Sequence, residues 1–180
     1  MAARRRIKIG IEAGSKRVFA SAVDFPGWAR ASRTEDEAIA RLLAYRDRYA
    51  LIAARAGVML PEMLAFDVVE RVVGNGTTDF GAPDLPFAFE AEPLSRAQAG
   101  RLSALLKACE AEFTAVAAQA PAVLAKGPRG GGRDTEAVLA HVAEADAMAV
   151  KRKSWPERSR LRRRAWHLTD HAWEIEDRLR

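Results

Sequence analysis

The spacing of apolar residues changes along this chain, and that change limits the folds open to it. Apolar and polar residues alternate in Lys8–Glu12 and Lys16–Asp24, on either side of a turn at Gly14, and again in Leu64–Val73. A period of two predicts strands, and the short glycine-containing connection predicts that the first two strands form a β-hairpin. Over residues 36–55 the apolar positions recur at helical spacing. The first half of the chain therefore predicts a β-β-α-β unit.

The second half has only helical spacing. It predicts helices from Ser95 to about Gln119, from Asp134 or Thr135 to about Val150, and from Trp155–Pro156 to the end. We therefore predict an α+β fold, in which the small β-β-α-β unit precedes a helical bundle of three long helices. The fourth bundle helix is short or is recruited from residues 36–55. Residues 75–94 are rich in glycine, proline and acids, which favours a domain boundary there, with units at 1–90 and 91–180.

The composition is typical of a globular intracellular protein. Hydrophobic residues make up 49% of the 180 residues and charged residues 29%, which argues against global disorder. No apolar run approaches the roughly 20 residues that span a bilayer, and no apolar signal core follows the basic N-terminus. The single cysteine, Cys109, cannot form an internal disulfide and is expected to be a small core residue rather than a nucleophile. We expect a cytoplasmic location and no membrane partner.

The three histidines of the chain, His141, His167 and His171, all lie in the predicted C-terminal helices. A helix places His167 and His171, four residues apart, on one face, where both imidazoles can chelate one divalent ion. An antiparallel helix can bring His141 to the same point, and three imidazoles with an open position are typical of catalytic zinc sites. The alternative is a set of packed or partly exposed imidazoles without a metal. Leu168 stands where the helical metalloprotease motif has its catalytic glutamate, which excludes that motif.

Two carboxylates lie one helical turn from these histidines. Glu144 follows His141 by three residues, and Asp170 follows His167 by three. Each is a candidate for an extra ligand, for an orienter of an imidazole, or for a proton acceptor. The spacing does not choose among these roles, and we take Glu144 and Asp170 as the candidate catalytic residues.

Positive charge is concentrated in Lys151–Arg164, which contains eight Lys or Arg residues and one acid, Glu157. Such a run can attract phosphates, nucleic acid or an acidic partner. The simpler interpretation is a solvated helix start. No nucleic-acid-binding motif accompanies the run, so nucleic acid is the weakest candidate partner.

The C-terminal helices resemble the DinB/YfiT-like superfamily of metal-binding four-helix bundles. The resemblance covers roughly residues 95–180 and depends on Ala140–Asp146 and Trp166–Arg178, which contain the three histidines. It implies a divalent metal, zinc or nickel, bound by His141, His167 and His171. It also implies transferase or isomerase chemistry with a low-molecular-weight thiol, whose sulfur the metal holds as thiolate. Family members have a further helix between the two histidine-bearing helices, where this chain has only about 15 residues.

The N-terminal part resembles the HicB-like antitoxin fold over about 50 residues. The hairpin, the turn at Asp24–Trp28 and the helix start at Ser32–Ala38 correspond to its strands, its Pro-Gly turn and its Thr-x-x-Glu-Ala motif. No DNA-binding segment follows, so the resemblance implies an interaction or dimerisation module rather than an antitoxin.

Two functions follow from these patterns. The first is a divalent-metal-binding protein of the DinB/YfiT-like type that acts as a metal-dependent, thiol-using transferase or related hydrolase on a small-molecule substrate. The alternative is a non-catalytic interaction module, in which the HicB-like half binds a protein partner or a second copy of the chain and the helices serve as a scaffold.

Overall fold

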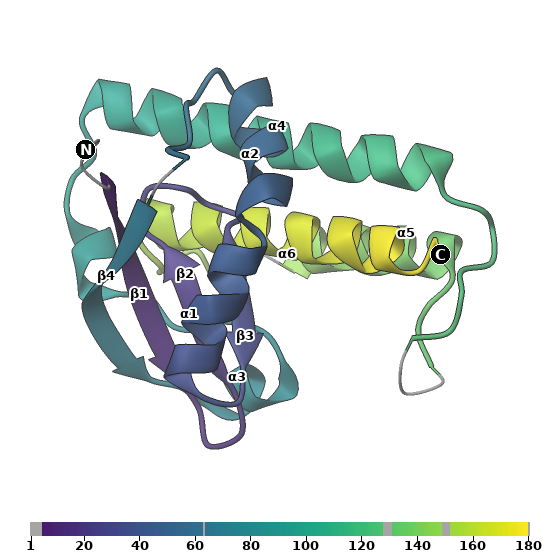
Figure 1. The fold of residues 1–180 in the computed structure, drawn as a ribbon, viewed down its shortest axis with the longest axis horizontal. Coiled ribbons are helices and arrows are strands. Elements are labelled where there is room, and N and C mark those ends of the chain that lie inside the picture. The colour runs from purple at the N-terminus through teal and green to yellow at the C-terminus, as the bar shows by residue number, and fades with distance from the viewer. Residues whose placement is uncertain (1–4, 63, 128–130, 149–151, 180) are drawn as a thin grey trace.

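The computed structural model describes residues 5–62, 64–127, 131–148 and 152–179, which form a mixed α/β fold around a four-stranded sheet (Figure 1). The strands are β1 (Arg5–Ala13), β2 (Val18–Ala22), β3 (Ala29–Ser32) and β4 (Leu64–Val73). Their order is β3-β2-β1-β4, with β1 antiparallel to β2, β2 antiparallel to β3, and β1 parallel to β4. The predicted hairpin and the predicted strand at Leu64–Val73 are confirmed.

The sequence does not predict strand β3, because four residues are too few to show an alternation of apolar and polar side chains. It forms after a tight turn in which the backbone N–H of Trp28 donates to the carbonyl of Phe25 at 3.0 Å. Gly27 in this turn has a φ of +93°, and a Cβ there would lie 2.8 Å from Cys109 Sγ. Glycine is therefore required both by the backbone conformation and by the close approach of the helix that carries Cys109. The N-terminal unit gains a strand that the β-β-α-β prediction lacks.

The predicted helix over residues 36–55 is two helices, α1 (Glu35–Ala44) and α2 (Arg46–Arg55), which meet at Tyr45. The indole N–H of Trp28 donates to the carbonyl of Leu42 at 2.9 Å. In a continuous helix that carbonyl would accept from the backbone N–H four residues on. The break lets α1 contact β2 and β3 while α2 contacts the long helix α4.

The remaining elements are α3 (Gly76–Phe80), the short 3-10 helix η1 (Ala88–Ala91), α4 (Arg96–Gln119), α5 (Thr135–Met148) and α6 (Glu157–Asp177). The three predicted C-terminal helices are therefore confirmed. Ser95 caps α4 by accepting from the backbone N–H of Gln98 at 3.3 Å. The long helices α4 and α6 lie side by side, and α5 lies against α6 (Figure 1).

The connection between β4 and α4 is fixed to the rest of the fold by two buried glutamates. Glu12 of β1 accepts from the hydroxyl of Thr78 at 2.6 Å and from the backbone N–H of Asp84 at 2.9 Å. Glu90 of η1 forms an ion pair with Arg162 of α6 at 2.7 Å. This connection, where the sequence favours a domain boundary, contains α3 and η1 and is held to both the sheet and α6.

A buried hydrophobic cluster joins the sheet to the helices. It includes Ile9 of β1, Trp28, Leu105 and Cys109 of α4, and Trp173 of α6. The predicted units 1–90 and 91–180 therefore share buried apolar side chains. No helix in the described part of the chain is both long enough and apolar enough to cross a membrane.

Candidate metal centre

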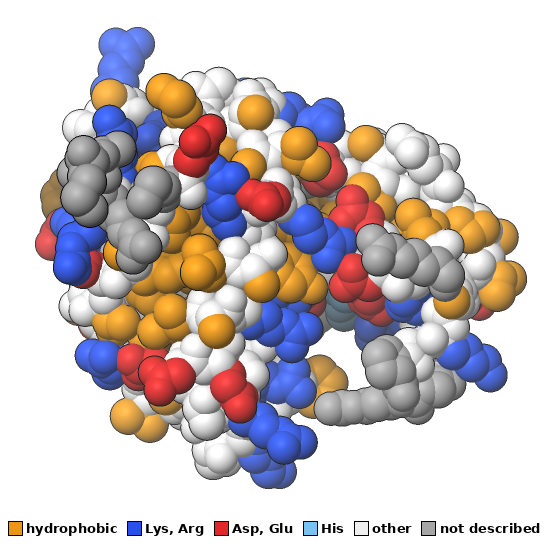
Figure 2. Space-filling view, in the orientation of Figure 1, with side chains coloured by type: hydrophobic (Ala, Val, Ile, Leu, Met, Phe, Trp, Pro, Cys, Tyr) orange, Lys and Arg blue, Asp and Glu red, His pale blue; other side chains and the backbone are white. Residues whose placement is uncertain are grey.

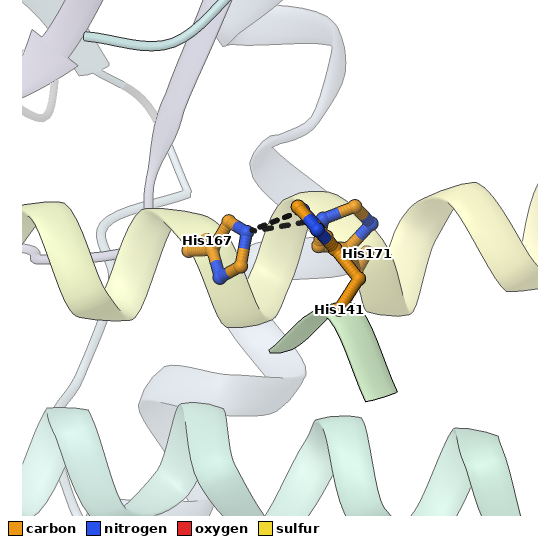
Figure 3. A group of neighbouring side chains, drawn as sticks. All are labelled: His141, His167 and His171. Carbon is orange, nitrogen blue, oxygen red and sulfur yellow. Dashed lines mark hydrogen bonds between the residues drawn. The ribbon is translucent and has the colours of Figure 1, made fainter. Parts of the chain in front are cut away.

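Two helices bring the three histidines to one point. His167 and His171 lie one turn apart on the buried face of α6, and His141 comes from α5, which lies against α6. Figure 3 shows the three rings converging. His167 and His171 are buried and His141 is partly buried. We call these residues the histidine cluster. The structure thus brings together the three residues that the sequence predicts as ligands.

The ring nitrogens of the histidine cluster have the spacing of a metal site. Nε2 of His167 lies 3.2 Å from Nε2 of His141 and 3.2 Å from Nε2 of His171. One ligand atom from each residue lies within 4.8 Å of the other two. In a tetrahedral site with metal–nitrogen distances of ~2.0–2.1 Å, ligand nitrogens lie about 3.3–3.4 Å apart. Two of the three nitrogen pairs are therefore within about 0.2 Å of the separation in a zinc site.

Hydrogen bonding alone does not account for this convergence. A neutral imidazole nitrogen carries either one proton or one lone pair. Nε2 of His167 therefore cannot form a full hydrogen bond with both neighbours. A cation that accepts three lone pairs satisfies all three nitrogens at once.

Glu174 sets the tautomer of one of the three rings. Its Oε2 lies 2.8 Å from Nδ1 of His171, so Nδ1 carries the proton and donates it, while the lone pair of Nε2 faces the cluster. The other carboxylate oxygen of Glu174 accepts from Arg178 at 3.3 Å. Arg178 in turn donates to the backbone carbonyls of Ala125 at 2.7 Å and Arg133 at 2.5 Å. The carboxylate that orients His171 is therefore itself held in place.

The electrostatics keep two of the imidazoles, those of His141 and His167, in the neutral form that binds a metal. Burial, with a smaller contribution from neighbouring His171, lowers the pKa of His167 to about 3. Burial is also the main cause that lowers the pKa of His141, and the charge of Arg133 adds to it. The hydrogen bond from His171 is the main cause that lowers the pKa of Glu174. At neutral pH the site therefore offers neutral imidazoles at His141 and His167 and an ionised carboxylate at Glu174, which suits a divalent cation.

The two carboxylates predicted from the sequence are not part of the converging group. Asp170 forms an ion pair with Arg30 of β3 at 3.0 Å. The guanidinium of Arg30 lies over the ring of Tyr45, 4.3 Å from its centroid. Glu144 is exposed on α5, one turn from His141. The carboxylate that contacts an imidazole is Glu174, and its position three residues after His171 is the signal that could have indicated it.

Cys109 is buried in the core, as predicted. Burial raises the pKa of its thiol to about 12, so the thiol stays protonated at neutral pH. A thiolate from this side chain is therefore not available for nucleophilic chemistry.

Comparison of the chain with models of known protein families, with curated proteins and with solved structures found no match. The resemblances of the two halves to DinB/YfiT-like and HicB-like proteins therefore stay predictions from the sequence. The case for the site depends on its own geometry.

Proposed function

We propose that this protein binds one divalent metal ion, zinc or nickel, through His141, His167 and His171. The observation that carries the proposal is the convergence of three Nε2 atoms that hydrogen bonding cannot satisfy together. The hydrogen bond from Nδ1 of His171 to the Glu174 carboxylate adds to it, because such carboxylate–histidine pairs accompany metal ligands.

We further propose that the metal serves catalysis, in thiol-using group transfer or a related hydrolysis. Three protein ligands leave a coordination position open, which is the arrangement of catalytic rather than structural zinc sites. When bound, the ion would supply Lewis-acid chemistry that lowers the pKa of a thiol or water ligand. Because Cys109 stays protonated, the reacting thiol in this proposal is a separate low-molecular-weight molecule.

The proposal also concerns the neighbouring residues and helices. Glu144, exposed near His141, is the candidate proton acceptor, whereas Asp170 is engaged with Arg30. Helix α2, which contacts α4, is the candidate for the fourth helix of a DinB/YfiT-like bundle. This choice agrees with the expected recruitment of a helix from residues 36–55.

Elemental analysis of protein purified without a histidine tag tests metal binding. We expect about one zinc or nickel per chain, and loss of that metal in the double variant His167→Ala, His171→Ala. The matched control is Asp177→Ala, which removes a polar side chain from the exposed end of the same helix and should leave the metal in place. Absence of metal from the wild type, even after dialysis against zinc and nickel, would reduce the cluster to packing histidines.

One observation favours the alternative, a non-catalytic interaction module. Strand β4 is at the edge of the sheet, its last residue Val73 is 86% exposed, and Phe80 in the following helix is 89% exposed. Exposed apolar side chains next to a sheet edge are typical of interaction surfaces. This function predicts binding of a protein partner that survives replacement of all three histidines and fails when Val73 and Phe80 are both changed to serine.

A further inference from the structure

A cavity of about 450 Å³ lies beside the histidine cluster, between α4, α5 and α6, and His167 forms part of its wall. Its size is within the range of small-molecule sites. Apolar lining comes from Leu106 of α4 and Leu161 of α6. Figure 2 shows one face of the molecule, on which a histidine side chain is visible between acidic and basic side chains. A ligand in this cavity would therefore lie next to the candidate metal centre.

The walls of the cavity carry an excess of positive charge. The basic side chains are Arg152, Lys153, Arg160, Arg163 and Arg164, against two acids, Asp146 and Glu157. All five basic residues belong to the basic run that the sequence shows at Lys151–Arg164. Lys151 itself lies outside the described residues. The fold therefore gathers much of this run around one cavity, where Lys153, Arg160 and Arg164 are also exposed to solvent.

Internal ion pairs neutralise only part of this charge. Arg152 pairs with Asp84 at 2.8 Å, and Arg164 pairs with Glu110 at 2.9 Å and Asp146 at 3.2 Å. By contrast, Lys153, Arg160 and Arg163 have no ion-pair partner within the described ranges of the chain. The cavity therefore retains three positive side chains that a ligand can neutralise.

Among the three basic residues left unpaired in the described chain, Arg163 has the surroundings that best suit the binding of an anion. Its guanidinium lies over the ring of Trp166, 4.6 Å from the centroid, and this contact helps to hold the guanidinium in place. Its Nε is buried and has no hydrogen-bond partner in the described part of the chain. Burial, reinforced by the charge of Arg152, lowers the pKa of Arg163 to about 10, so the side chain is still cationic at neutral pH. The residue is only partly buried, so its guanidinium can be reached from the cavity, and an anion bound there would supply the charge partner that the described residues do not.

The position of Arg163 relates this anion site to the metal centre. Arg163 and His167 are one turn apart on α6 and both line the cavity. An acid group held at Arg163 would place the rest of a small molecule along the apolar wall and toward His167.

We propose that the cavity is a substrate subsite for a small organic anion, with a carboxylate or phosphate group bound by Arg163 and Arg160 and an apolar body against Leu106 and Leu161. Its role as a substrate site rests on the proposed metal-dependent function, but anion binding by the cavity does not. The guanidinium group of arginine binds a carboxylate and a phosphate in the same way, through two parallel N–H donors.

Calorimetric titration of the metal-free protein with phenyl phosphate, benzoate and the neutral benzyl alcohol tests the proposal. We expect submillimolar binding of one or both anions and at least tenfold weaker binding of the alcohol. Whichever of phenyl phosphate and benzoate binds more tightly identifies the acid group that the cavity prefers. Arg163→Met should weaken anion binding at least tenfold, and Arg160→Met, at a more exposed position, should weaken it severalfold. The matched control Arg41→Met removes an exposed arginine on α1 and should change the affinity less than twofold.

Repeating the titration on the zinc-loaded protein separates the two proposals. Anion binding without zinc binding would support the cavity and contradict the metal centre. Zinc binding with equal affinity for the alcohol and the anions would overturn the cavity proposal and leave the metal centre standing. A DNA oligonucleotide that binds while phenyl phosphate and benzoate do not would overturn it in favour of nucleic-acid binding by the basic run.

Discussion

Helix α6 contributes to two buried polar clusters, one built on a carboxylate and one on three ring nitrogens, and the two differ in how those central atoms are paired. In the first, which we call the Glu90 cluster, the carboxylate of Glu90 accepts from the backbone N–H of Phe87, from Ser159 Oγ and from two nitrogens of Arg162, at 2.7–3.1 Å. In the histidine cluster, a turn and a half further along the helix, three nitrogens meet with no group between them to satisfy all three.

The difference separates a carboxylate that is paired within the chain from the cluster that we propose to bind a metal. Buried polar groups are stable when they find partners, and the Glu90 carboxylate has four donors, although Nη1 of Arg162 is buried without a partner among the described residues. The three Nε2 atoms of the histidine cluster cannot all satisfy one another, and in our proposal a divalent cation pairs with them. Arg163, between the two clusters, also has a buried nitrogen, its Nε, without a partner in the described chain. The predictions below test this division, from the largest expected effect to the smallest.

Breaking the Glu90 cluster should affect stability far more than metal content. Glu90→Gln leaves Arg162 buried without its counter-charge, and we expect a loss of about 3–5 kcal/mol in the free energy of unfolding, measured by urea denaturation of the metal-free protein. The double variant Glu90→Leu, Arg162→Met should recover most of this loss. Metal content of the folded single variant should be that of the wild type. A loss below about 1 kcal/mol would show that the pair is not structurally important.

Removing the carboxylate that orients His171 should weaken the metal centre without unfolding it. Glu174→Gln is expected to lower zinc affinity about 10- to 100-fold, measured by competition with a chromophoric chelator. Glu176→Gln is the matched control, because Glu176 is on the same helix but pairs with Arg48. Equal affinities of the two variants would mean that Glu174 has no role in metal binding.

The metal-free protein should lose stability as the pH falls below 6.5. His167 has a pKa of about 3 when folded against an ordinary value of 6.5, so the unfolded chain takes up the proton first. The stabilising contribution of a neutral His167 is complete above pH 6.5 and is lost progressively as the pH falls toward 3. The loss reaches about 2 kcal/mol at pH 5. Urea denaturation at pH 5 and pH 8 measures it. His167→Gln should be less sensitive to this pH change, and an identical pH dependence in both proteins would contradict the burial of a neutral imidazole.

The smallest effect is expected for Asp170, which the sequence predicts as a candidate catalytic residue and which the structure pairs with Arg30. Asp170→Asn removes the partner of Arg30 and should lower the free energy of unfolding by about 1 kcal/mol, while zinc affinity stays within twofold of the wild type. The same stability and metal-competition assays apply. If zinc affinity falls as far as in Glu174→Gln, Asp170 belongs to the metal centre after all.

Much of the fold and most of the site follow from local patterns. The hairpin, the strand at Leu64–Val73 and the three C-terminal helices are set by the period of their apolar residues. Thr34 and Ser95 cap their helices by accepting from the backbone N–H three residues on, a contact that is local in the sequence. The four-residue separation of His167 and His171 likewise requires only a helix to place both rings on one face.

Other features depend on contacts between distant segments. Strand β3 is too short to be predicted and forms by pairing with β2. The break at Tyr45 coincides with the indole of Trp28, which occupies the carbonyl of Leu42. No pattern within residues 36–55 contains that information, because the donor comes from another part of the chain.

The sequence by itself determined that α6 presents two histidines on one face and that carboxylates lie one turn from each of them. The tertiary structure decided which carboxylate contacts an imidazole: Arg30 of β3 pairs with Asp170, while Glu174 accepts from His171. It also decided the use of the basic run, part of which forms internal ion pairs while Arg160 and Arg163 line the cavity. The physical reason is the same in both cases. A helix fixes the direction of a side chain, but only a neighbouring segment can supply its partner.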